Sequence, residues 1–163
     1  FYNLLPNETL SEVIYKNLVT VGGVIYNDVE INFAKKILDT YDGDYRIESV
    51  EEITSYTTEK RNVGGSTDVG DVSWKVPTAG MSAATWVPGT SAHTWQAVAA
   101  GGTSIGIKGM LIAAKTIALT AQDIFTDSDI IIRAKKELEE RIGKNEPYKA
   151  LIGDRDPPLN YRN

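Results

Sequence analysis

The sequence reads GGSTDVGDVSW at residues 64–74, TAGMSAATWVPG at 78–89, AHTWQ at 92–96 and GGTSIGIK at 101–108. This stretch, Gly64 to Lys108, decides the predicted fold because it contains the segment that most favours a β-strand. It also holds the only histidine, His93, and all three tryptophans. A lone histidine forms neither a metal site nor a catalytic triad. Any site in this stretch therefore needs further residues from elsewhere.

Residues 78–87 predict a strand that is covered on both faces. One face would carry Met81 and Val87 among alanine and threonine, and the other would carry Gly80, Ser82 and Trp86. Small residues on both faces are typical of a central strand that helices approach closely. Pro88 and Gly89 then end the strand, and the chain enters a loop that leads to His93.

Helical patterns surround this segment. Capping boxes at Thr9–Glu12 and Asn27–Glu30 predict two helices within residues 9–42. Residues 104–125 are apolar nearly all round, which predicts a buried helix, and residues 128–142 carry an apolar stripe with a charged outer face. We expect a loop over 41–62, with room for a short helix or strand near Val50 to Tyr56, and then a short helix that ends before Pro77. The fold class predicted is α/β, with helices packed on a small sheet.

Bulk properties exclude several classes of protein. The 163 residues suit one domain, and the net charge of −5 disfavours nucleic acid as a partner, since phosphate binding requires a basic face. The absence of cysteine excludes disulfides, zinc fingers and thiol catalysis, and it fits a cytoplasmic protein. The apolar run from Met110 to Ala121 contains Lys115 and is too short for a bilayer, so we expect no membrane partner.

Two kinds of catalytic motif are weak here. The run GGTSIGIK at 101–108 lacks a glycine directly before Lys108 and a hydroxyl residue after it, so it is not a phosphate-binding P-loop. Close helix packing explains its glycines, although the amides at this helix start could hold a carboxylate. A serine nucleophile paired with His93 would be Ser66, Ser82 or Ser91, but no GxSxG motif is present.

A metal site is the third candidate. His93 together with Asp68 and Asp71 would provide an imidazole and two carboxylates, which suit zinc or manganese. The two aspartates share a face of the expected short helix. Helix capping also explains an aspartate there, and an isolated histidine in a loop is more often only a polar loop residue.

Several of these strings, in order and spacing, resemble one family over nearly the whole chain. They are 64–74, Trp86-Val-Pro-Gly89, Ala92-His-Thr-Trp-Gln96, Gly102-Thr-Ser-Ile-Gly106 and 108–115. They resemble the C-terminal part of metal-dependent amidohydrolases of the aminoacylase and acetylornithine deacetylase-like metallopeptidase family. This resemblance implies an α/β catalytic domain with two metal ions, an inserted lid domain and a glutamate general base, which cleaves the amide bond of N-acyl amino acids.

The resemblance also implies roles for individual residues. His93 would be the last metal ligand, with zinc or manganese as the metal. Asp68 lies in a block that, in the family, stands beside the active site, so Asp68, Thr67 and Asp71 would support the ligands or contact the substrate. The turn with Gly102 and Ser104 would face the substrate side of the cleft. No residue of this chain is assigned as the catalytic acid or base.

The chain departs from the family pattern because the other histidine and glutamate ligands are not in it. We therefore expect residues 1–163 to form one partial catalytic domain, a C-terminal fragment without the lid domain and the N-terminal catalytic half. One histidine cannot hold two metal ions, so the isolated chain is expected to be inactive. The alternative is a non-catalytic binding module that self-associates through its exposed half-core.

Overall fold

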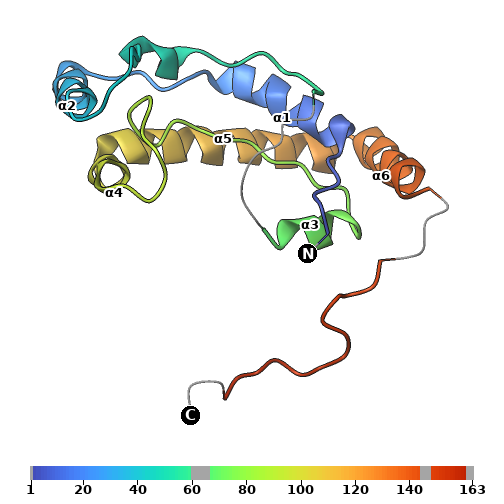
Figure 1. Ribbon diagram of the computed structural model, residues 1–163. Helices are drawn as coiled ribbons and strands as arrows, with labels where there is room; N and C mark the ends of the chain where they lie inside the picture. Colours follow the sequence, from blue (N-terminus) through green and yellow to red (C-terminus); the bar gives the residue numbers. More distant parts are fainter. Residues whose placement is uncertain (1, 60–66, 144–147, 161–163) are drawn as a thin grey trace.

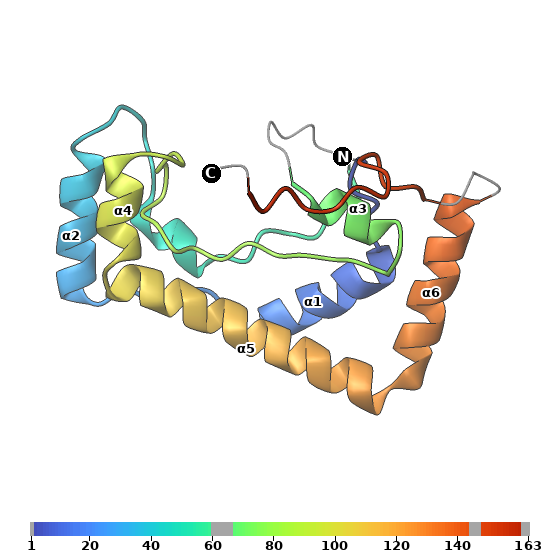
Figure 2. The ribbon, with the colours of Figure 1, turned by 90° about the horizontal axis from the view of Figure 1, so that it is seen from below.

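The computed structural model describes residues 2–59, 67–143 and 148–160, and within them every regular element is a helix. Figures 1 and 2 show α5 as the longest element, with α1 beside it and α4 and α6 near its two ends. The helices are α1 (Glu8–Val21), α2 (Asp28–Leu38), the 3-10 helix η1 (Ile47–Glu51), α3 (Val69–Ser73), α4 (Trp95–Gly101), α5 (Ser104–Thr126) and α6 (Ser128–Ile142).

The α/β prediction is wrong, because the described residues contain no strand and form an all-α structure. Residues 78–87 are extended, yet they pair with no second strand and run along α5 (Figure 2). Gly109 of α5 lies so close to this segment that a Cβ there would collide with the carbonyl group of Ala84. The small residues of 78–87 thus permit close contact with a helix, and the sequence pattern did not distinguish this from packing in a sheet.

The start of α1 lies two residues earlier than the Thr9–Glu12 capping box predicts. Its N-cap is Asn7, whose side-chain oxygen accepts a hydrogen bond from the Leu10 amide at 3.1 Å. The side-chain nitrogen of Asn7, Nδ2, donates to the Ala134 carbonyl of α6 at 2.9 Å, and Asn7 is only 1% exposed. One buried asparagine therefore both caps α1 and joins it to α6.

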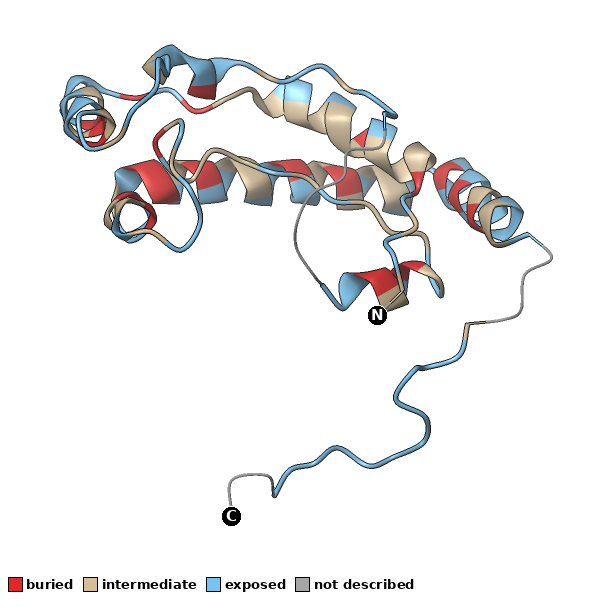
Figure 3. Ribbon diagram, viewed as in Figure 1, coloured by how far each residue is buried: buried red, intermediate tan, exposed pale blue. Residues whose placement is uncertain are grey.

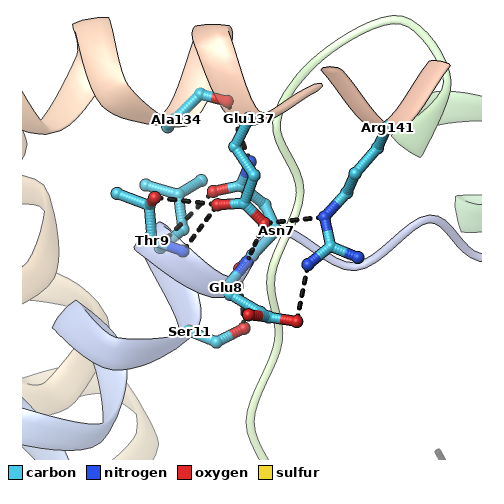
Figure 4. A network of polar contacts seen from close by, with 8 residues as sticks. Asn7, Glu8, Thr9, Ser11, Ala134, Glu137 and Arg141 are labelled. Atoms are coloured by element: carbon cyan, nitrogen blue, oxygen red, sulfur yellow. Dashed lines mark hydrogen bonds and ion pairs between the residues drawn. The ribbon is translucent and has the colours of Figure 1, made fainter. Parts of the chain in front are cut away.

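Glu137 of α6 completes this junction (Figure 4). Its carboxylate accepts hydrogen bonds from the amides of Glu8 at 2.6 Å and Thr9 at 2.8 Å, where the dipole of α1 is positive. Arg141, one turn later, contacts both Glu137 at 2.8 Å and Glu8 at 2.6 Å. Burial opposes ionisation of Glu137, but these donors outweigh it and lower the pKa of the carboxyl group.

The helix predicted at 104–125 is present as α5, but it is not buried all round. One face packs against α1, and Gly109 and Thr116 on it are buried, whereas much of the opposite face is exposed (Figure 3). By length and composition alone, Ser104–Thr126 also meets the requirement for a membrane span, contrary to our estimate for Met110 to Ala121. A core helix of a globular protein passes the same test.

The largest group of buried apolar residues lies where η1, α2 and α4 meet the start of α5. The Val24 amide donates to the Val50 carbonyl at 2.9 Å, which holds the segment before α2 against η1. A Cβ at Gly23 would collide with the backbone of Glu51, so this approach requires glycine. The buried members of this core are Val24, Tyr26, Ala34, Ile37, Val50, Val87, Ala100 and Ile105.

The Glu137 junction predicts a specific loss of stability on substitution. Glu137→Gln should lower the free energy of unfolding at pH 7 by about 1–3 kcal/mol, because it removes charge-assisted hydrogen bonds from the start of α1. Glu139→Gln, on the exposed side of the same helix, is the matched control and should change it by less than about 0.5 kcal/mol. Urea denaturation followed by circular dichroism measures both.

The pH dependence of the same variants gives a second readout. Because the folded-state pKa of Glu137 lies below its ordinary value of 4.5, its contribution is complete above that pH. The contribution is lost as the pH falls through the folded-state pKa, so the stability curves of wild type and Glu137→Gln should converge in acid. A constant gap between the two curves down to the acid limit would contradict this role of Glu137.

Candidate functional site

His93 has the most unusual backbone in the described part of the chain. Its φ of 63° places it in the left-handed region, and no other described residue except glycine has a positive φ. The residue is exposed, and no hydrogen bond or ion pair to its imidazole is present among the described residues. A bulky residue in this conformation costs about 1–3 kcal/mol, and such strain is found most often at functional sites.

Local structure fixes where the imidazole lies. Thr94 is the N-cap of α4, and its hydroxyl donates to the Ser91 carbonyl at 2.8 Å while it accepts from the Ala97 amide at 3.3 Å. His93 therefore directly precedes the N-cap residue of α4. The sequence pattern indicated only a loop here and gave no sign of α4.

Two tryptophans flank His93 in a shallow hollow that is open to solvent. Trp86, 37% exposed, lies near the end of the extended segment that runs along α5, and Trp95, 60% exposed, is the first residue of α4. The lining consists of Trp86, His93, Thr94, Trp95, Ala97 and Val98. The hollow thus offers aromatic surface beside one imidazole, a combination suited to binding a flat aromatic group.

Asp68 and Asp71 do not join His93. They lie at the start of α3, which both Figures 1 and 2 place well away from α4. The Asp71 carboxylate interacts instead with the Tyr148 hydroxyl. The Thr67 hydroxyl accepts from the Val69 amide at 3.2 Å, which is a local turn contact. A substrate-side role for these three residues stays a prediction.

Gly102 and Ser104 lie at the other end of α4 from His93. Gly102 is the C-cap of α4, and Ser104 is the first residue of α5. The Ser104 hydroxyl donates to a carboxylate oxygen of Glu30 at 2.6 Å, so a carboxylate from this chain already occupies the start of α5. That contact explains the motif at 101–108 without a ligand, and a substrate-side role for Gly102 and Ser104 also stays a prediction.

Glu30 is a buried charged group whose tertiary partners are not evident from the sequence. Its carboxylate is 3% exposed and accepts from the Lys108 ammonium at 2.5 Å and from the Asn27 amide at 2.8 Å. Burial opposes its ionisation, but these donors together with Ser104 lower the pKa of the carboxyl group. The nearby Glu30 charge adds to burial in raising the pKa of Tyr26 to about 12. The Asn27–Glu30 capping box is confirmed, but only the tertiary fold brings Lys108 to it.

The structure does not support the other two predicted sites, a cluster of metal ligands and a serine–histidine pair. Among the described residues, no group of three or more histidine, aspartate or glutamate side chains could hold a metal ion, so these residues alone do not fit a two-metal centre. Ser91 and Ser82 form no hydrogen bond with His93, and Ser66 lies outside the described residues together with Gly64 and Gly65. A second hollow of about 500 Å³ lies between α1, residues 49–57 and residues 80–84, away from His93.

Comparisons with known proteins identify one curated relative. The chain is 34% identical to a subunit of the p-aminobenzoyl-glutamate hydrolase of Escherichia coli (strain K12), over 172 aligned positions that cover 91% of this chain. The match falls in the C-terminal part of that protein and spans 36% of its length. This match confirms that the motifs of the chain resemble the C-terminal part of such a hydrolase. No family model matches the chain, and no solved structure matches it.

The strain at His93 can be measured through glycine substitution. His93→Gly should leave the free energy of unfolding unchanged or raise it by up to about 1 kcal/mol, because glycine adopts positive φ without a steric cost. Ala92→Gly, at a neighbouring position without positive φ, should lower it by about 0.5–1 kcal/mol. Denaturant titrations of the two variants test this, and a larger loss for His93→Gly than for Ala92→Gly would show that His93 is not strained.

Proposed function

We propose that this chain supplies one wall of the active site of a metal-dependent amidohydrolase, and that His93 is one ligand of its divalent metal. The observation that carries the proposal is the exposed, strained His93, whose imidazole has no hydrogen-bond partner among the described residues. A histidine that binds a metal needs an accessible ring nitrogen that no group of the protein occupies, and His93 meets this requirement. A free imidazole nitrogen is a preferred ligand of zinc and of related metals.

The curated relative supports the class of reaction. Its name describes hydrolysis of p-aminobenzoyl-glutamate, in which an amide bond joins an aromatic acyl group to an amino acid. We propose a substrate of this N-acyl amino acid class for the present protein. Trp86 and Trp95, which line the same hollow as His93, would bind the aromatic acyl group by stacking.

The remaining ligands and the general base must come from outside the described residues. The chain spans about a third of the length of its relative, so a complete site in a longer protein or an assembly is consistent with the similarity. No catalytic step follows from the present residues, because a single imidazole neither holds a metal pair nor serves as the glutamate base. The function proposed for the chain is therefore to contribute a ligand and to position the substrate.

A second class of function, a non-catalytic module that self-associates, is favoured by the exposed apolar side chains of α5. The two classes differ in what His93 should do. In the hydrolase, removal of the imidazole abolishes turnover in the complete enzyme, whereas in the module it has no effect on assembly.

The purified 163-residue chain should not hydrolyse p-aminobenzoyl-glutamate or other N-acyl amino acids, with or without added zinc or manganese. The physical reason is that its described residues offer no cluster of metal ligands. Release of p-aminobenzoate or of free amine can be followed by absorbance and by chromatography. Metal-dependent turnover that co-purifies with the chain and is abolished by His93→Ala would contradict the prediction.

A chimera tests the active part of the proposal. This chain would replace the matched C-terminal part of the Escherichia coli relative, and we expect metal-dependent hydrolysis of p-aminobenzoyl-glutamate. His93→Ala in the chimera should lower kcat/KM by at least about 100-fold through loss of a metal ligand, with a matching loss of bound metal. Ser91→Ala, two residues away, is the control and should stay within about threefold, while full activity of a folded His93→Ala chimera would refute the role of His93.

A further inference from the structure

We propose that Tyr41 is a positioning residue for His93, because its hydroxyl fixes the turn from which the chain continues to the imidazole. The inference rests on the proposed function and deepens it, since it names the residue that holds the ligand-bearing loop in place. It follows from the contacts of residues 40–45 with the two segments that flank His93, which are the turn at residues 87–90 and helix α4.

The turn before His93 has the signature of a type II β-turn. The Thr90 amide donates to the Val87 carbonyl at 3.1 Å, so that Pro88 and Gly89 take the two central positions. Gly89 has a φ of 82°, as the third residue of this turn type requires. A type II turn differs from a type I turn mainly in the orientation of its central peptide group. The direction of the Pro88 carbonyl therefore decides which turn forms.

Tyr41 contacts two polar groups of this turn. Its hydroxyl donates to the Pro88 carbonyl at 2.6 Å and lies 3.4 Å from the Thr90 hydroxyl. A phenol has a single hydrogen to donate, so the Thr90 hydroxyl is the donor in the second contact. The Tyr41 ring packs against the buried apolar group that contains Val87. One half-buried side chain thus holds both the central peptide group of the turn and its last residue.

A second tyrosine supports Tyr41 from the side. The rings of Tyr41 and Tyr45 meet edge to face, with their centroids 5.8 Å apart, which is a favourable arrangement for two aromatic rings. A Cβ at Gly89 or at Gly43 would collide with the Tyr45 ring, so this ring lies against both glycines. The turn is therefore held by a hydrogen bond from one tyrosine and by the ring of the other.

The segment after His93 is attached to the same loop. The side-chain nitrogen of Gln96, in the first turn of α4, donates to the Thr40 hydroxyl at 3.0 Å. Thr40 directly precedes Tyr41, so two adjacent residues contact the chain on both sides of His93. A single short loop after α2 thus sets the distance between the two segments that the His93 loop must connect.

The connection between these segments is short enough to explain the backbone of His93. Tyr41 contacts Thr90, and the N-cap Thr94 begins α4, so only residues 91–93 lie between the two. A strained residue persists only where the surrounding structure holds it, and His93 is the residue with positive φ in this connection. Loss of the Tyr41 hydroxyl should therefore let the backbone at His93 relax.

Tyr41→Phe tests the proposal, because it removes the hydroxyl and keeps the ring. In the 163-residue chain labelled with ¹³C-histidine, His93 gives the only histidine Cα signal, and the chemical shift of this signal reports the left-handed backbone. We expect Tyr41→Phe to move the signal away from the left-handed range. Thr90→Val should move it in the same direction by less. Tyr15→Phe is the matched control and should leave it in place, since the Tyr15 hydroxyl has no hydrogen bond among the described residues.

The chimera with the Escherichia coli relative gives a second readout. Tyr41→Phe should weaken the binding of zinc about tenfold, as is usual for a group that supports a metal ligand, and should lower kcat/KM at limiting zinc by a similar factor. Saturating zinc should restore kcat to within about threefold of the parent chimera, with KM for p-aminobenzoyl-glutamate changed by less than about twofold. Tyr15→Phe should behave as the parent chimera does.

The failure of this inference can be told from the failure of the proposed function. A fully active His93→Ala chimera would refute the metal-ligand role, while a displaced His93 signal in Tyr41→Phe would still support the positioning role. If His93→Ala abolishes turnover but Tyr41→Phe leaves the His93 signal and the zinc affinity unchanged, the positioning role is refuted alone. If Tyr41→Phe does not fold, the His93 signal of Thr90→Val decides in the same way.

Discussion

The packing of other segments against one side of α5 is the constraint on which the rest of the structure depends. Gly109 admits the backbone of Ala84, and Gly106 admits the carbonyl of Gly101, so two chain segments lie against α5 with no side chain between them. α1, α4 and α6 all contact the same helix. The buried carboxylate of Glu30, which Ser104 and Lys108 contact, then holds α2 against the first turns of α5. A side chain at either glycine would collide with the backbone of the segment packed on it and push that segment away from α5.

This constraint explains how a small helical framework positions an exposed histidine. α4 joins α5 through the short turn at Gly102–Thr103, and Trp86 lies in the extended segment that runs along α5. His93 is therefore exposed, and it directly precedes Thr94, the N-cap of α4, with a left-handed backbone. The same one-sided packing leaves much of the opposite side of α5 exposed among the described residues.

The sequence allowed the helices to be predicted more reliably than the way they pack. The Asn27–Glu30 box and the glycines at Gly22 and Gly143 mark helix ends correctly, because these signals are local. Residues 78–87 were misassigned, since small residues permit close contact with a strand or a helix alike. α4 was missed because seven residues give little periodicity. For the site, His93 was evident as the only histidine, whereas its positive φ and the distance of Asp68 from it depend on tertiary structure.

The central claim is that His93 is a free metal ligand whose partners are not in the described residues of this chain. Because His93 is the only histidine, its imidazole gives unique signals in a ¹H–¹³C NMR spectrum, and a zinc titration of the isolated chain can follow them. We predict that these signals shift with weak affinity, on the order of millimolar, as expected for one imidazole without other ligands. Saturation at micromolar zinc would contradict the claim, and so would an imidazole that does not respond to zinc at all.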